Sequence, residues 1–105
     1  MFLPKGGIVM GEIFTSIDLG TSKINIIIGE IDKNGYIQIM GVGNSPCEGI
    51  KKGVVVDIES TSMAILAALE QAENMANVEV TEAYVNIPGG YTHLIRNKGI
   101  IAVSG

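Results

Sequence analysis

The feature that most constrains the fold is a pair of β-prone runs separated by a short polar turn. The first run covers residues 13–19 and the second covers residues 24–31, with Gly-Thr-Ser-Lys at residues 20–23 between them. Two such runs around a glycine-led turn predict a β-hairpin. The second run contains three consecutive isoleucines, residues 26–28, and is too apolar for a strand with one wet face. We therefore expect it to lie inside a covered sheet.

A third strand and a loop follow the hairpin. Asn-Gly at residues 34–35 is the strongest short turn signal in the chain, and residues 36–42 continue as a strand after it. Three consecutive antiparallel strands form a meander. Residues 43–52 predict a loop because they contain asparagine, proline and glycine. Lys51 and Lys52 lie at the end of this predicted loop, and we expect both side chains to be solvated.

One long helix and a fourth strand complete the predicted core. Asp57 is a natural N-cap, and apolar residues at helical spacing predict a helix over residues 58–76. We expect Ile58 on its apolar face and Met75 in the core. Residues 80–87 predict the fourth strand, and two further short strands follow it.

Composition and charge exclude several classes of protein. The chain has 105 residues, of which 47% are hydrophobic and 17% charged, so it has the apolar surface for one core. A net charge of −4 gives no basic footprint for nucleic acid, and no nucleic-acid partner is expected. Neither Cys47, in a loop, nor His93, which stands alone, has neighbours that predict a catalytic or metal site.

Gly41 and Gly43 raise the question of a dinucleotide-binding loop. Pro46 stands where the third glycine of that fingerprint belongs. No acidic residue follows a strand at the required distance either. We therefore exclude a dinucleotide-binding fingerprint.

The best candidate for chemistry is the turn sequence Asp-Leu-Gly-Thr-Ser-Lys at residues 18–23. An apolar strand that ends in Asp18 places a carboxylate at its tip, and the residues after it can turn successive backbone N–H groups toward one point. Such a concavity binds phosphate, while the carboxylate can hold Mg²⁺ directly or through water. The alternative is an ordinary hairpin turn in which Asp18 and Thr21 only satisfy local backbone groups.

Three stretches of the chain resemble known families. Residues 17–23, Ile-Asp-Leu-Gly-Thr-Ser-Lys, resemble the first phosphate motif of the actin, Hsp70 and sugar-kinase superfamily. Residues 49–59, Gly-Ile-Lys-Lys-Gly-Val-Val-Val-Asp-Ile-Glu, and residues 84–90, Tyr-Val-Asn-Ile-Pro-Gly-Gly, resemble the FtsA family of bacterial cell-division proteins. The resemblance covers nearly the whole chain from about residue 12 onward.

This resemblance implies an α/β fold, a partial actin-like (ribonuclease H-like) core subdomain. Its elements are a three-stranded antiparallel meander, a helix and a fourth strand, followed by the start of an inserted β-rich subdomain. The resemblance divides the chain into an N-terminal extension at residues 1–11, the first part of core subdomain 1A at residues 12–90, and the start of subdomain 1C at residues 91–105. It also implies an N-terminal fragment that carries only the first phosphate motif of a longer protein.

The function that the resemblance implies is an ATP-binding scaffold that links FtsZ to the cytoplasmic membrane at the division septum. FtsZ and other divisome proteins are the expected partners, together with self-association. The resemblance implies that the membrane contact is made by a C-terminal helix of the longer protein, which we do not expect within these residues. Nucleotide binding in the family is tied to polymerisation more than to turnover, so we expect no competent ATPase.

The expected cofactors are ATP and Mg²⁺. By resemblance, Asp18 organises the metal, through water, and Lys23 adds positive charge at the turn. The groups expected to contact the β- and γ-phosphates belong to Gly20, Thr21 and Ser22.

Two alternatives remain open at this point. One is a non-catalytic interaction module that assembles through exposed strand edges, in particular the strand at residues 99–103. The other is a different actin-fold protein, such as a PilM-like pilus assembly factor or a sugar kinase. The stretch at residues 49–59 favours FtsA over both of these actin-fold proteins.

Overall fold

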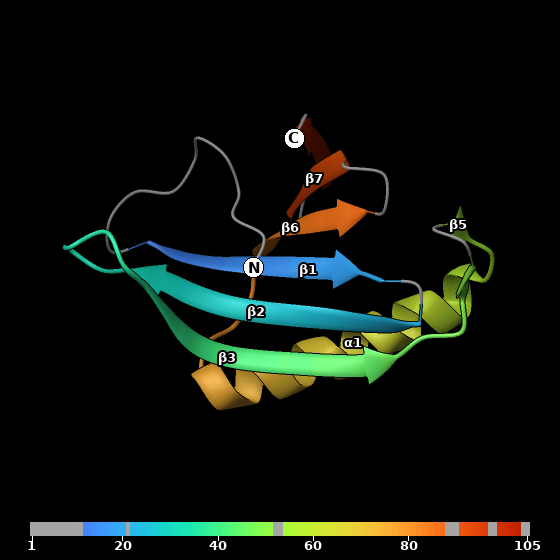
Figure 1. Ribbon diagram of the computed structural model, residues 1–105, viewed down its shortest axis with the longest axis horizontal. Coiled ribbons are helices and arrows are strands. Elements are labelled where there is room, and N and C mark those ends of the chain that lie inside the picture. The colour runs from blue at the N-terminus through green and yellow to red at the C-terminus, as the bar shows by residue number, and fades with distance from the viewer. Residues whose placement is uncertain (1–11, 21, 52–53, 88–90, 97–98, 104–105) are drawn as a thin grey trace.

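The chain folds as an α/β structure in which a long helix covers one face of a mixed sheet (Figure 1). The computed structural model describes residues 12–20, 22–51, 54–87, 91–96 and 99–103, with backbone alone from residue 87 onward. The elements, in chain order, are β1 (Ile13–Leu19), β2 (Lys23–Ile31), β3 (Ile37–Pro46), β4 (Ile50–Lys51), β5 (Val54–Val55), α1 (Ile58–Ala76), β6 (Glu82–Ile87), β7 (Tyr91–Arg96) and β8 (Gly99–Val103).

The sheet has the strand order β3-β2-β1-β6-β7-β8. β1 pairs with β2 and β2 with β3, both antiparallel, so the predicted meander is confirmed. β6 returns parallel to β1 on its other side. β7 and β8 extend the same sheet as antiparallel strands. The division of the chain at residue 90 stays a prediction.

The predicted loop at residues 43–52 is wrong in its first part, because β3 continues to Pro46 and pairs with β2 over that length. Gly43 and Ser45 are buried on one side of this strand, whereas Asn44 is exposed. This alternation is that of a strand with one covered face. The last part of the predicted loop contains β4, which pairs antiparallel with β5 beyond the loop.

The core lies between α1 and the sheet. Ile24, Ile26 and Ile28 of β2 have no exposed surface. Their register partners on β1 include Leu19 and Ile17, which are also buried. The hydrophobic effect at this aliphatic layer is the main force that holds the helix on the sheet.

Glycines and alanines set the distance between α1 and β3. The helix buries Ala64, Ala68 and Ala72 at a spacing of four residues. A Cβ at Gly43 would overlap the carbonyl oxygen of Ala68, and a Cβ at Gly41 would overlap that of Ala72. The two backbones therefore approach more closely than any side chain on β3 would allow. The glycine pair excluded above as a nucleotide fingerprint has this packing role.

This close approach explains why two helix residues are not where the sequence predicts them. Ile58 is 76% exposed and Met75 is 64% exposed, so both predicted core positions are wrong. The face that β3 accepts is the one with small side chains, because larger ones would hold the helix away from the strand. Met63 and Leu66 are likewise exposed, whereas Ile65 and Leu69 are partly buried and pack against the core.

The ends of α1 are capped by side chain and backbone. The Asp57 side chain accepts a hydrogen bond of 3.0 Å from the Ser60 N–H, as the sequence predicts for an N-cap. At the other end Asn77 takes the left-handed conformation, with φ of 56°, and its N–H donates to the Glu73 carbonyl at 2.7 Å. Both caps fix where the helix begins and ends.

The outer edge of β3 is covered at one position by a side chain of the helix. The side-chain amide of Gln71 donates a hydrogen bond of 2.9 Å to the Asn44 carbonyl. It also accepts a hydrogen bond of 3.2 Å from the Asn44 N–H. Both backbone groups of Asn44 are thus engaged as a neighbouring strand would engage them. Pro46, two residues on, has no N–H to offer. The two residues blunt this edge against pairing with another strand.

We expect Gly43→Ala to destabilise the chain by about 1–3 kcal/mol, because the new methyl group forces α1 away from β3. Urea denaturation followed by circular dichroism measures the change. Val42→Ala is the matched control, since Val42 is the exposed neighbour on the same strand, and should cost about 0.5 kcal/mol or less. Equal effects of the two substitutions would contradict the close contact.

We expect Gln71→Ala to cost about 1 kcal/mol and to free both backbone groups of Asn44 for intermolecular pairing. Light scattering at increasing concentration should then show association that Glu70→Ala, at the exposed neighbouring position, does not cause. If the two variants behaved alike, the Gln71 contact would have no protective role at this edge.

Candidate functional site

The turn between β1 and β2 is held tightly by its own backbone. The Gly20 N–H donates to the Lys23 carbonyl at 3.0 Å, and a Cβ at Gly20 would lie 2.8 Å from that carbonyl oxygen. A residue without a side chain is therefore required at position 20. The Ser22 carbonyl accepts a hydrogen bond of 2.8 Å from the Cys47 N–H, which connects the turn to the residue after β3.

Asp18 lies next to this turn and is held from the neighbouring strand. It is half-buried near the end of β1, and its Oδ1 accepts a hydrogen bond of 2.9 Å from Nδ2 of Asn86 on β6. β1 and β6 pair in parallel, and Asp18 and Asn86 are direct partners in their register. No hydrogen bond from the described residues reaches Oδ2 of Asp18. This oxygen is the one that can face a cation or its water.

Asp18 is part of a polar row that crosses four strands. Directly paired residues project on the same face of a sheet, and this row lies opposite the face covered by α1, since its positions alternate with buried ones such as Ile24 and Gly43. The row, in strand order from β3 to β6, is Asn44, Asn25, Asp18 and Asn86. Asp18 is its only charged member.

The predicted site residues are brought together only in part. Asp18, Gly20, Ser22 and Lys23 lie at one end of the β1–β2 hairpin, with Ser22 and Lys23 exposed. Thr21 lies outside the described residues. The Gly20 N–H is already bonded to Lys23. In this conformation the Gly20 N–H is therefore not available as a donor to a ligand.

The sequence predicts that Lys51 and Lys52 are a solvated pair. Lys51 is exposed on β4, and Lys52 lies outside the described residues. Asn86 is the residue that sequence reasoning missed. The signal was a polar side chain in the middle of an apolar strand, but its meaning depends on the register between two strands 68 residues apart in sequence.

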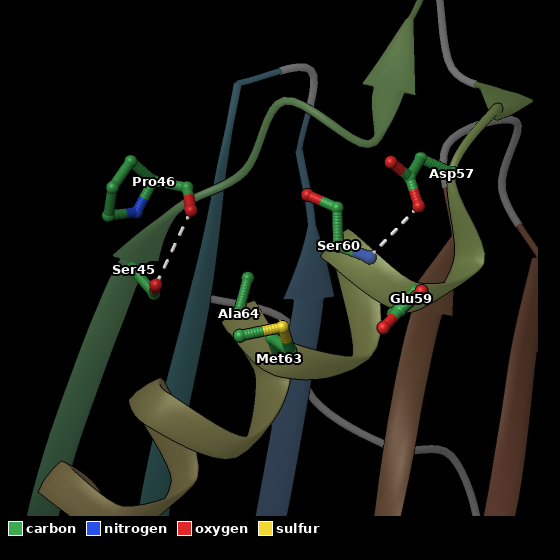
Figure 2. Close-up of a pocket in the computed structure, with 7 residues that line it drawn as sticks. All are labelled: Ser45, Pro46, Asp57, Glu59, Ser60, Met63 and Ala64. Atoms are coloured by element: carbon green, nitrogen blue, oxygen red, sulfur yellow. Dashed lines mark hydrogen bonds between the residues drawn. The ribbon is translucent and has the colours of Figure 1, made fainter.

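A separate hollow of about 460 Å³ opens beside the N-terminus of α1. Figure 2 shows its lining, which comes from the end of β3 and the first turns of the helix: Ser45, Pro46, Asp57, Glu59, Ser60, Met63 and Ala64. Asp57 already accepts from the Ser60 N–H here, and Glu59 adds a second carboxylate. Two carboxylates at a helix N-terminus disfavour an anion. The hollow is therefore a poor phosphate site.

Three further observations bear on the kind of site. Cys47 is buried, and its Sγ lies 3.6 Å from Oγ1 of Thr61, so it belongs to the core.

Within the described ranges no group of three or more His, Cys, Asp or Glu side chains is placed to hold a metal ion. No helix in that part of the chain is long and apolar enough to span a membrane.

The arrangement defines a class of protein. A three-stranded antiparallel meander, a helix and a fourth strand parallel to the first form an α/β unit with a carboxylate at the end of the first strand. This is consistent with a partial actin-like core, as the sequence predicts.

Comparison with known proteins identifies the family. The family described as Cell division protein FtsA matches residues 15–98. Cell division protein FtsA of Pseudomonas aeruginosa is 38% identical over 93 residues, and that of Bacillus subtilis is 41% identical over 93 residues; each alignment covers 89% of this chain. The chain belongs to the FtsA family of cell division proteins.

The matched part is a small portion of each relative. The alignments cover 22% of the Pseudomonas protein and 21% of the Bacillus protein. Cell division protein FtsA of Escherichia coli K12 is 30% identical, with 22% of its length covered. The chain thus spans about a fifth of the length of these relatives, and what the whole proteins do is not carried by this segment alone.

Proposed function

We propose that this chain is the N-terminal part of an FtsA-like, actin-fold scaffold, in which it supplies the first phosphate-binding motif for ATP and Mg²⁺. The observation that carries this proposal is the placement of Asp18. Its carboxylate stands at the end of β1, beside a turn that only glycine at position 20 permits. Asn86 engages one carboxylate oxygen, and no hydrogen bond from another described residue reaches the second oxygen, which we assign to a cation.

The chemistry of these side chains fits a hydrated Mg²⁺ ion. Mg²⁺ usually keeps several waters and binds proteins through one or two carboxylates together with substrate phosphates. One carboxylate at Asp18, with exposed Ser22 and Lys23 nearby in the turn, suits that pattern. The ion would offset the charge of the phosphates, while Lys23 adds a second positive group.

The proposed roles of the turn residues differ in kind. Gly20 permits the tight turn itself, since a side chain there would meet the Lys23 carbonyl. Ser22, which is exposed, supplies a hydroxyl group to the β- or γ-phosphate, and Thr21 is proposed for the same task by resemblance. We expect binding without rapid hydrolysis.

The cellular role in the proposal follows from membership of the family. We propose that the longer protein acts in the divisome at the cytoplasmic face of the membrane at the septum, where it links FtsZ to that membrane. Because the chain spans about a fifth of its relatives, contacts with FtsZ and with the membrane are assigned to the rest of the protein. Self-association is assigned to surfaces other than the β3 edge at Asn44, which Gln71 covers.

We expect Asp18→Asn to weaken binding of Mg-ATP by the full-length protein about tenfold or more, because it removes the charge that faces the hydrated cation. An asparagine keeps an oxygen that can accept from Asn86, so the strand contact survives. Isothermal titration calorimetry measures the affinity. Glu59→Gln, which neutralises an exposed carboxylate of the hollow, is the matched control and should leave the affinity unchanged.

Two results would contradict the proposal. One is absence of Mg-ATP binding by the unsubstituted full-length protein. The other is an unchanged affinity in Asp18→Asn.

A further inference from the structure

We propose that Asn86 is a positioning residue for the phosphate site: its side-chain amide fixes the rotation of the Asp18 carboxylate, so that Oδ2 is presented to the hydrated cation. The inference rests on the proposed function and deepens it. It assigns a role to a residue on β6 that lies outside the turn motif.

The geometry of the two strands supports this role. Asp18 and Asn86 are register partners on parallel strands, and Nδ2 of Asn86 lies 2.9 Å from Oδ1 of Asp18. The terminal torsion of an aspartate side chain has a broad range of allowed angles. A single short hydrogen bond to one oxygen narrows that range and thereby determines the direction of the other oxygen.

The chemical type of the partner matters as much as its position. An amide is a neutral donor, so it holds Oδ1 without cancelling the negative charge that attracts a cation. A lysine or arginine in its place would form an ion pair with Asp18 and compete with the metal. A second carboxylate would repel the first. Asparagine holds Asp18 and keeps its charge available.

A purely structural role is the alternative. In that case the hydrogen bond would only help to join β6 to β1. The strands already pair over three residues, and the middle pair, Ile17 and Val85, is buried. The polar contact at Asn86 is therefore an addition to an existing strand contact, and its removal need not separate the strands.

The polar row offers an internal control. Asn44 carries the same side chain in the same row, two strands away from Asp18. Its contact with Gln71 uses the Asn44 backbone. Asn44→Ala therefore removes an identical side chain from the row and leaves both Asp18 and the Gln71 contact in place.

The test is a double-mutant cycle in the full-length protein with Asn86→Ala, Asp18→Asn and the pair together. Calorimetry gives the dissociation constant of ATP in MgCl₂ and in EDTA, and the ratio of the two constants is the magnesium gain. We expect Asn86→Ala to reduce this gain about three- to tenfold with little change in EDTA. In the Asp18→Asn background it should have no further effect, and Asn44→Ala should match the unsubstituted protein.

Each other outcome has a distinct meaning. Equal weakening in MgCl₂ and in EDTA, or an additive loss in the Asp18→Asn background, would overturn the positioning role and leave the proposed function intact. Absence of a magnesium gain in the unsubstituted protein would overturn the proposed function itself. Asn86→Leu, of similar size and without a donor, serves as the second variant. Unfolding of both variants would assign Asn86 to the fold and would also overturn the inference.

Discussion

The close contact between α1 and β3 is the constraint on which the rest of the structure depends. Gly41 and Gly43 remove every side chain from the strand at the two points where the carbonyls of Ala68 and Ala72 lie. The helix can then rest on the sheet with its alanine face, and the isoleucines of β2 are fully enclosed. Larger residues at any of these positions would separate the layers and expose that aliphatic core.

The same contact has a consequence for the proposed phosphate site. Because α1 runs back along the sheet, the chain re-enters it as β6, parallel to β1. Parallel pairing sets Asn86 directly beside Asp18 at one end of the sheet. The helix thus contributes no side chain to the Asp18 contact, yet its packing determines which strand supplies the partner of Asp18.

Much of this architecture could be predicted from the sequence, because the signals are local. The hairpin, the Asn-Gly turn and the Asp57 cap each depend on residues close together in the chain, and all are confirmed. The prediction was wrong where a local signal had a distant cause. Gly43, Asn44 and Pro46 indicated a loop, but the reason for Gly43 is the helix residue Ala68, 25 residues later. The role of Asn86 depends on strand register, which no local pattern reveals.

The most direct test of the central claim is a crystal structure of the full-length protein with Mg²⁺ and a non-hydrolysable ATP analogue. We expect the phosphates at the β1–β2 turn, a metal-bound water within hydrogen-bonding distance of Oδ2 of Asp18, and Oδ1 still bonded to Asn86. Phosphates bound elsewhere, for example at the hollow beside Asp57 and Glu59, or an Asp18 carboxylate turned away from the metal, would contradict it.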